Sequence, residues 1–327
     1  MADYKNIKGF NIQYLDSDPP NPIEGQMWFN STSQTLKGAE AGGIPAGTWA
    51  SGGSLNTAKA SMGSAGTSQN AAITFGGAAP GATAITEEYN GTSWTELNDL
   101  NTARSEASRG LGGSSTSAIY GSSPPTTTAV ESWNGTSWTE ITEFNTGRYN
   151  HNVAGANSTA FLVFGGEIPG GGFRTETEVW NGTSWTEVNN LLTAVNNAGS
   201  TGTSTAAICI GGQGPPNGAV DESVSWNGTS WTEIATIPRT TRSNSSAGTS
   251  TLALISAGDG PGNTAFTSFW NGSAWAELAD LSTAKQGLSS GGVSTSAIAA
   301  GGYAPSITTA TEEWTVPDVV TKTFTTS

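Results

Sequence analysis

The octapeptide WNGTSWTE occupies residues 133–140 and recurs without change at residues 180–187 and 226–233. A copy that starts with Tyr, YNGTSWTE, occupies residues 89–96, and a diverged copy, WNGSAWAE, occupies residues 270–277. Repetition at a fixed period is typical of repeat architectures. Asn-Gly favours a tight β-hairpin, because Gly has no Cβ and Asn tolerates positive φ. The octapeptide therefore predicts two short strands joined by an Asn-Gly turn, and we interpret it as scaffold.

The aromatic residues of this motif form two series that repeat about every 45 residues, the length of one four-stranded propeller blade. The second aromatic position of the motif is Trp49, Trp94, Trp138, Trp185, Trp231 and Trp275. The first is Tyr89, Trp133, Trp180, Trp226, Trp270 and Trp314. Between them lie apolar runs such as AAITFGG and turn segments such as LNTAR. Each unit thus predicts four short strands, with the tryptophans as structural residues of the repeat.

Paired glycines that end one strand, followed by a spaced aromatic residue and then Trp, resemble the kelch repeat. The best copies contain Gly76-Gly77, Gly165-Gly166, Gly211-Gly212 and Gly301-Gly302, whereas Gly121-Ser122 and Ala257-Gly258 depart from the double glycine. The resemblance covers about residues 47–316 and implies an all-β, six-bladed kelch-like β-propeller. Kelch spacing is specific for the fold and not for a function.

The closure of the ring has more than one solution in the sequence. The segment GTWAS at residues 47–51 precedes the first complete unit, and the last aromatic strand, around Trp314, has no Trp strand after it. We expect the Trp49 strand to complete the last blade. Alternatively, the C-terminal VTKTFTTS supplies that strand, or the N-terminal hairpin adds a seventh blade. The expected domains are an N-terminal docking arm with a β-hairpin (1–46), the propeller (47–316) and a C-terminal strand or tail (317–327).

Composition and charge argue against several classes of partner. The chain of 327 residues has a formal net charge of −14 and only 12% charged residues. Nucleic-acid binding needs clustered Lys and Arg, so we expect no nucleic acid as partner. No apolar stretch approaches the length of a membrane span or resembles a signal peptide, so we expect synthesis in a cytoplasm and no membrane insertion.

The residues of metal and catalytic chemistry are scarce. His151 is the one histidine and Cys209 the one cysteine, too few for a His-bearing copper or zinc site. We expect a buried structural thiol at Cys209 and a channel-lining or turn position for His151. Basic residues recur in the turn segments at Lys59, Arg104, Arg148, Arg242 and Lys285, and their repetition indicates a structural role. The sequence therefore predicts no catalytic residue, no metal site and no cofactor.

The loops between the apolar and aromatic strands differ in length and content while the scaffold stays nearly constant. Divergent loops on a rigid scaffold are typical of recognition surfaces, although drift of unconstrained loops produces the same pattern. Sugar recognition combines an aromatic platform with amide and hydroxyl partners. The candidate receptor-binding residues are Phe173, Arg174, Asn217, Asn263 and Tyr303.

The N-terminal arm differs from the repeat and contains apolar residues that need a partner: Phe10, Tyr14, Trp28 and Phe29. This segment resembles the amino-terminal segments of bacteriophage tail and fibre proteins, and the Gly/Ser/Thr-rich propeller is similar to structural proteins of marine phages. The resemblance implies a non-enzymatic virion protein, made in a host cytoplasm. Its partners would be other virion proteins or copies of itself, and a host surface glycan or protein. The alternatives are a bacterial surface adhesin or lectin-like kelch protein and, more weakly, a glycan-processing enzyme.

Overall fold

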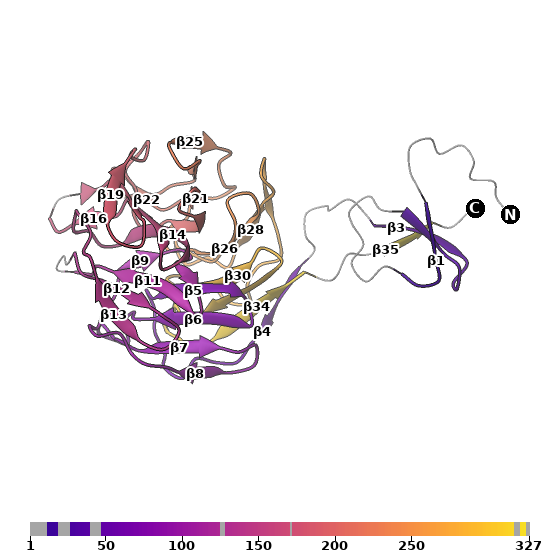
Figure 1. Cartoon of the computed structure of the whole chain (residues 1–327), viewed down its shortest axis with the longest axis horizontal. Coiled ribbons are helices and arrows are strands. Elements are labelled where there is room, and N and C mark those ends of the chain that lie inside the picture. Colours follow the sequence, from indigo (N-terminus) through magenta and orange to yellow (C-terminus); the bar gives the residue numbers. More distant parts are fainter. Residues whose placement is uncertain are drawn as a thin grey trace. The chain divides into compact units, whose positions relative to one another are not determined.

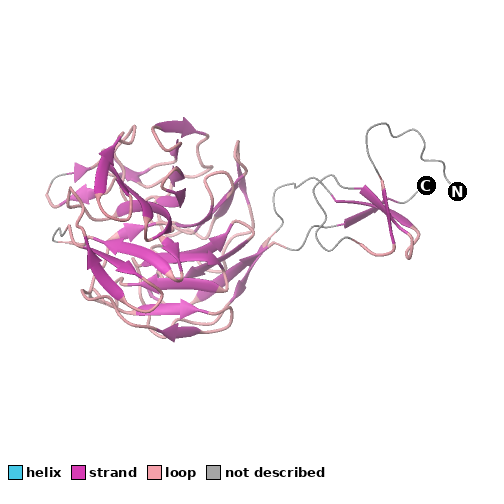
Figure 2. Cartoon of the chain, in the orientation of Figure 1, coloured by secondary structure: helices cyan, strands magenta, loops and turns pink. Residues whose placement is uncertain are grey.

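The protein is described as a computed structural model, in which residues 12–18, 27–39, 47–124, 128–170, 172–316 and 321–324 are placed. The chain divides into two compact units. One unit is Gly47–Thr315, and the other combines Met1–Ala46 with Val316–Ser327. All regular elements of the described residues are strands (Figure 2), and none is a helix that could cross a membrane.

The unit Gly47–Thr315 is a β-propeller of six blades, each with four antiparallel strands, and the sheet of blade 3 has one further, parallel strand (Figure 1). Blade 1 contains β5 (Gly63–Ser68), β6 (Ala71–Phe75), β7 (Thr86–Tyr89) and β8 (Trp94–Glu96). Blade 2 contains β10 (Gly113–Ser114), β11 (Ser117–Gly121), β12 (Val130–Trp133) and β13 (Trp138–Ile141). Blade 3 contains β14 (His151–Asn157), β15 (Ala160–Phe164), β18 (Thr177–Trp180) and β19 (Trp185–Val188).

The other three blades repeat this order. Blade 4 contains β20 (Gly199–Thr203), β21 (Ala206–Ile210), β24 (Ser223–Trp226) and β25 (Trp231–Ile234). Blade 5 contains β26 (Ser245–Gly248), β27 (Ala253–Ser256), β28 (Thr267–Trp270) and β29 (Trp275–Glu277). Blade 6 contains β30 (Ser289–Val293), β31 (Ser296–Ala300), β34 (Thr311–Thr315) and β4 (Thr48–Ser51).

The strand around Trp49 closes the ring, as the sequence predicts. β4 pairs antiparallel with β34, with Trp49 opposite Trp314 and their ring centroids 5.5 Å apart. The Trp49 indole also donates a 2.9 Å hydrogen bond to Thr267 Oγ1 of blade 5. The two alternative closures are wrong, because the C-terminal β35 (Thr321–Phe324) pairs with β3 (Thr35–Ala39) in the other unit.

The aromatic series holds neighbouring blades together. Opposite each Trp of an outer strand lies an aromatic residue of the adjacent strand, as between Trp133 and Trp138, whose ring centroids are 5.4 Å apart. The outer Trp also reaches the preceding blade. Trp138 Nε1 donates to Thr86 Oγ1 at 3.0 Å, and Trp94 and Trp231 make the same contact with Thr311 and Thr177. Each such indole therefore belongs to the hydrophobic core and also connects its blade to the preceding one. We call the boundary between two neighbouring blades a joint.

The single Tyr of the first aromatic series lies where the ring closes. Tyr89 Oη donates a hydrogen bond to Glu313 of blade 6 and accepts one from the backbone N–H of Gly53 at 3.2 Å. Gln69 of blade 1 binds the other oxygen of the Glu313 carboxylate, at 3.2 Å. A Trp at position 89 has no hydroxyl, so these polar bonds reinforce the joint between the first and last blades.

The Asn-Gly turn differs from the tight hairpin that the sequence predicts. Trp133 pairs directly with Trp138, so the connection has the four residues Asn-Gly-Thr-Ser, and only Gly135 has positive φ, at 90°. Asn134 instead accepts hydrogen bonds at 2.9 Å from the N–H groups of Thr136 and Ser137 through Oδ1. The Asn is required as a cap of the turn, in the manner of an Asx turn.

The central channel is crossed by a segment of blade 2. The N–H of Leu111 donates to the carbonyl of Ser200 in blade 4 at 3.1 Å, and the N–H of Gly112 donates to Ser64 in blade 1 at 2.9 Å. Blades 1 and 4 lie opposite each other in a six-membered ring. The short β9 (Ser108–Arg109) pairs in parallel with β14 of blade 3. Blade 2 therefore has only the two-residue β10 as its inner strand, and the backbone at Leu111 and Gly112 bridges blades 4 and 1.

The described part of the second unit is a four-stranded sheet built from three N-terminal strands and the C-terminal β35. β1 (Gln13–Leu15) pairs in parallel with β2 (Met27–Asn30), which forms the predicted hairpin with β3, and β3 pairs with β35. Tyr14 stacks on Phe29 at 4.8 Å and is 73% exposed, whereas Trp28 is fully buried. Phe10 lies outside the described residues. Hydrogen bonds from Lys37, Asn30 and Trp28 lower the pKa of Asp18 to about 2.

His151 is buried in a joint between blades and does not line the channel. Its ring packs edge-on against Phe144 at 5.3 Å and is fully excluded from solvent. Burial, together with the nearby Arg148 guanidinium, lowers the pKa of His151 from 6.5 to about 3.

This depressed pKa makes stability dependent on pH. Between about pH 6.5 and 3 the unfolded chain binds a proton at His151 that the folded chain does not, so the free energy of unfolding should fall on acidification. The expected contribution is about 1.4 kcal/mol per pH unit in that window. Urea unfolding at pH 7, 6 and 5 checks this, with His151→Phe as the reference that removes only this titration. An unchanged pH dependence in the variant would contradict the assignment.

Candidate functional site

The connections between the second and third strands of the blades emerge on the face where the inner strands begin. Three form short hairpins: β16 (Glu167–Ile168) with β17 (Gly172–Phe173), β22 (Gln213–Gly214) with β23 (Gly218–Ala219), and β32 (Tyr303–Ala304) with β33 (Ser306–Ile307). In five blades the connection pairs with the segment that leads into an inner strand, as Gln286 pairs with Tyr303. These connections therefore surround the channel mouth.

The mouth itself is ringed by six residues at equivalent positions, all with positive φ. They are Ser61, Glu106, Asn150, Asn197, Ser243 and Gly287, with φ between 50° and 67°. Backbone hydrogen bonds of 2.7–2.9 Å link neighbours in the ring, for example from the N–H of Asn197 to the carbonyl of Asn150. Positive φ in a residue other than Gly is sparsely populated, and such strain gathers at functional sites.

The ring and its neighbours line a polar cup of about 230 Å³. Its lining residues are Ser61, Glu106, Asn150, Asn197, Gln213, Arg242, Ser243 and Gln286. Asn150 donates to Glu167 at 3.1 Å through its side-chain amide, and Arg242 forms an ion pair of 2.7 Å with Asp259. The cup thus combines amide, hydroxyl and charged groups, which suit a hydroxyl-rich or mixed-charge ligand.

The structure brings together only some of the candidate loop residues. Asn263 donates a 2.9 Å hydrogen bond to the carbonyl of Tyr303, so the loops of blades 5 and 6 meet, and Tyr303 is 44% exposed. Phe173 and Arg174 belong to the connection of blade 3, where Arg174 forms an ion pair with Glu176. Asn217 lies at the tip of the blade 4 hairpin and bonds with Gln213 at 2.7 Å. All five lie on the connections around the cup.

Sequence reasoning missed the cup because its members share no residue type. They share only their position in the repeat. Each lies two residues after the position of the repeated basic residue of the turn, as Glu106 follows Arg104. That position holds Ser, Glu, Asn, Asn, Ser and Gly in the six blades, so no motif marks it.

Four of the repeated basic residues are buried in ion pairs. Lys59, Arg104, Arg148 and Lys285 pair with Glu87, Glu131, Glu178 and Glu312, respectively, and all are at most 5% exposed. The same carboxylates accept backbone N–H groups of the turn, as Glu131 accepts Asn101 at 2.7 Å. Arg242 is not part of this set, because Thr241 occupies the equivalent place and Arg242 follows it. These groups fix the turns between blades.

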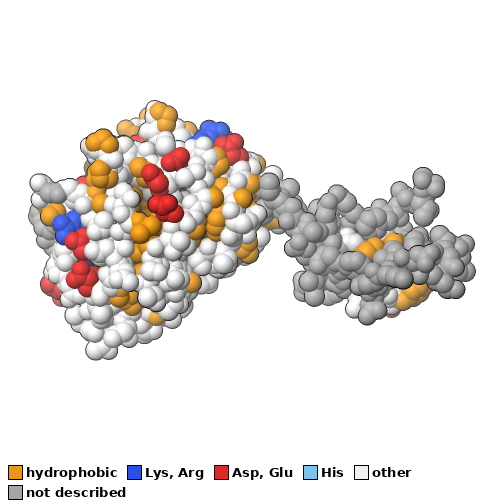
Figure 3. Space-filling model, turned by 90° about the horizontal axis from the view of Figure 1, so that it is seen from above, with side chains coloured by type: hydrophobic (Ala, Val, Ile, Leu, Met, Phe, Trp, Pro, Cys, Tyr) orange, Lys and Arg blue, Asp and Glu red, His pale blue; other side chains and the backbone are white. Residues whose placement is uncertain are grey.

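The structure also bears on the predictions for the Cys209 thiol and for a metal site. Cys209 is buried, as predicted, and burial raises the pKa of its thiol to about 12, which keeps it protonated. Among the described residues, no group of three or more His, Cys, Asp or Glu side chains is arranged to hold a metal ion. Charged side chains lie in small scattered groups on the face shown in Figure 3.

Comparison with known proteins places the fold. The solved structure of YjhT, a kelch-repeat β-propeller, matches with a TM-score of 0.67 at 13% sequence identity, over 83% of this chain and 99% of that chain. No family model matches the chain, and no curated protein matches it significantly. At this identity the likeness shows the fold alone, a kelch-type propeller.

Proposed function

We propose that the protein is a non-enzymatic attachment protein whose propeller binds a ligand at the polar cup. The observation that carries the proposal is the set of divergent hairpins around one strained, hydrophilic channel mouth. The scaffold is nearly invariant from blade to blade, so the differences between blades are concentrated on this face. A neutral, hydroxyl-rich surface glycan fits the amide, hydroxyl and aromatic groups offered there.

The second unit supports an attachment role, because it supplies a sheet distinct from the propeller. Its exposed Tyr14, stacked on Phe29, offers an aromatic surface to another subunit. We assign residues 1–46 to docking within a larger assembly. From the resemblance to phage tail and fibre segments we infer that this assembly is a virion, with other virion proteins or copies of this chain as the partners.

Glycan binding should depend on the cup face and not on the opposite face. Tyr303→Ala removes an exposed aromatic platform, and the expected result is at least tenfold weaker binding, since loss of an anchor commonly costs about 2 kcal/mol. The measurement is binding of the intact chain to arrays of bacterial surface polysaccharides.

The matched control is Leu252→Ala. Leu252 is 48% exposed and lies in the turn between β26 and β27, on the opposite face. Equal losses in both variants, or none in Tyr303→Ala and in Asn197→Ala at the cup, would refute the assignment. Turnover of a bound glycan would favour the glycan-processing alternative.

A further inference from the structure

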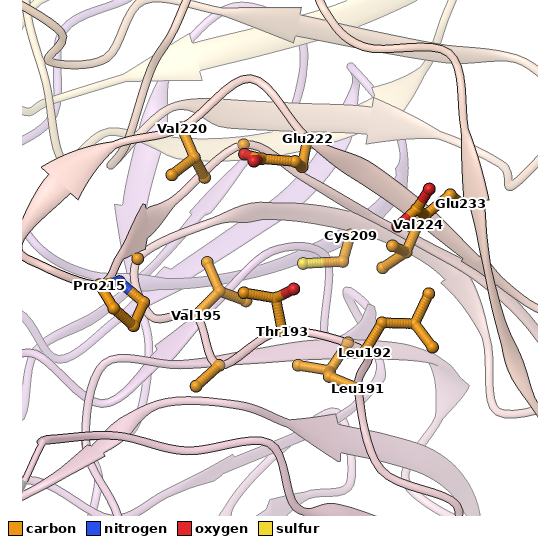
Figure 4. A pocket seen from close by; sticks show the side chains of 13 residues that line it. Leu191, Leu192, Thr193, Val195, Cys209, Pro215, Val220, Glu222, Val224 and Glu233 are labelled. Atoms are coloured by element: carbon orange, nitrogen blue, oxygen red, sulfur yellow. The ribbon is translucent and has the colours of Figure 1, made fainter.

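The joint between blades 3 and 4 contains a cavity where four of the other joints contain a buried ion pair (Figure 4). Val195 occupies the position of the Lys or Arg, and Val224 occupies the position of the Glu. The cavity has a volume of about 100 Å³. Figure 4 shows Val195, Cys209 and Val224 around it, with Glu222 and Glu233 at its edge.

The turn above this cavity keeps the hydrogen-bond donors whose acceptor has been lost. In blade 2 the N–H groups of Asn101 and Thr102 donate to Glu131 at 2.7 and 3.2 Å. In blade 4 the equivalent residues are Leu192 and Thr193, and Val224 offers no acceptor. The start of the turn has the same backbone hydrogen bond in both blades. The N–H of Leu191 donates to the carbonyl of Thr175 at 2.9 Å, and the N–H of Leu100 donates to the carbonyl of Ala84 at 3.0 Å.

Blade 5 also lacks the ion pair, but its residues at the equivalent positions differ from those of blade 4. Its turn carries Pro238 where the others carry Asn, Leu or Ser, and Pro has no N–H to satisfy. Thr241 and Ser268 occupy the positions of the cation and the Glu, and the buried Phe266 fills this joint. Blade 5 therefore lacks one of the two donors together with the acceptor, whereas blade 4 lacks the acceptor alone and has a cavity.

We propose that this cavity binds a short acyl amide group of a neutral ligand. Its volume accommodates about three or four non-hydrogen atoms, at roughly 30 Å³ each, which is enough for the carbonyl group and two aliphatic carbons of such a ligand while its nitrogen lies at the rim. The carbonyl oxygen accepts from the N–H groups of Leu192 and Thr193, and the aliphatic carbons contact Val195, Cys209 and Val224. The amide N–H faces the rim, where Glu222 and Glu233 can accept it.

The charges at the rim exclude an anion from this site. Among the described residues that line the cavity, the charged groups are Glu222 and Glu233, and neither Lys nor Arg is present. A carboxylate ligand would be repelled by both side chains, although it fits the same volume. The site is separate from the polar cup, and the inference does not depend on the proposed glycan binding.

The test uses propionamide as the probe and propionate as its anionic analogue. In ¹⁵N–¹H spectra of the intact chain, propionamide should shift the amide resonances of Leu192 and Thr193 saturably, with a dissociation constant on the order of millimolar for so small a molecule. Propionate should give at least a tenfold weaker effect. Absence of a saturable shift, or equal binding of propionate, would overturn the proposal.

Two variants locate the probe. Val195→Arg with Val224→Glu rebuilds the ion pair of the other joints, fills the cavity and should abolish binding. Leu192→Pro removes one donor, with Pro238 as the precedent at this position, and should weaken binding at least fivefold while the cavity remains. Unchanged affinity in the filled variant overturns the proposal. If that variant does not fold, unchanged affinity in Leu192→Pro does so.

Discussion

A chain that begins at Gly52 should unfold at a temperature about ten degrees below that of a chain that begins at Gly47. The five residues between these two starts contain β4, which completes blade 6. Without β4 the fully buried Trp314 loses the indole of Trp49, which is itself partly buried. Deleting a fully buried large aromatic residue costs about 3–5 kcal/mol, and we expect a loss in the lower part of this range from Trp49 itself. In a protein of this size each kcal/mol corresponds to roughly 2–4 °C.

The loss should exceed that of Trp49 alone. β34 becomes an unpaired edge, which exposes a row of backbone donors and acceptors to solvent and to other chains. Gly47 also packs on the face of the Trp314 ring so closely that a Cβ there would overlap it. Thermal unfolding of both truncated chains gives the comparison, and aggregation of the shorter one is an additional expected result.

The chain that begins at Gly47 separates two roles of the N-terminal region, namely closure of the ring by β4 and the proposed docking by residues 1–46. It keeps every strand of the propeller, because Gly47–Thr315 forms a compact unit by itself. Under the proposed docking role it should bind its ligand normally and fail to join the assembly. If the chain that begins at Gly52 is as heat-resistant as the one that begins at Gly47, closure by β4 contributes little to stability.

The blades and their closure were predictable from the sequence, because each depends on a contact that recurs. The tryptophans pair across neighbouring strands of one blade, so their spacing reports the length of a blade directly. Trp49 had no partner in its own repeat, and Trp314 had none either, which predicted their pairing. Tyr89 could not be explained in this way, because its hydroxyl binds Glu313 more than two hundred positions along the chain.

Features that depend on a single tertiary contact were not predictable. Leu111 crosses the channel because its N–H reaches Ser200, and no repeat of the sequence encodes that bond. The assignment of Arg242 to the repeated cations was wrong by one position, because Thr241 makes the backbone bond that defines the place. Val195 stands out in the sequence, but the cavity becomes visible only when Val224, on a distant strand, is known to face it.

Replacing Glu178 alone by Val should lower the free energy of unfolding by about 3–5 kcal/mol. Glu178 forms a buried ion pair with Arg148 and accepts the N–H of Asn145 at 2.9 Å. Its removal leaves a buried guanidinium, whose pKa burial already lowers, and unpaired backbone donors. Denaturant unfolding at pH 7 measures the loss. The surface pair of Arg239 and Glu277, both about half exposed, is the control, and Arg239→Ala should cost less than about 1 kcal/mol.

The double variant Arg148→Val with Glu178→Val should be more stable than Glu178→Val alone, although it lacks two side chains. Blade 4 already has two valines at the positions of the ion pair, because Val195 and Val224 pack in the same hydrophobic cluster. Two apolar residues avoid the desolvation of two ions, and only the turn donors remain without an acceptor. A double-mutant cycle should therefore give a coupling of about 2 kcal/mol or more. Strictly additive losses would mean that the two charged residues do not stabilise each other. The two valines of blade 4 would then give no advantage over a single replacement.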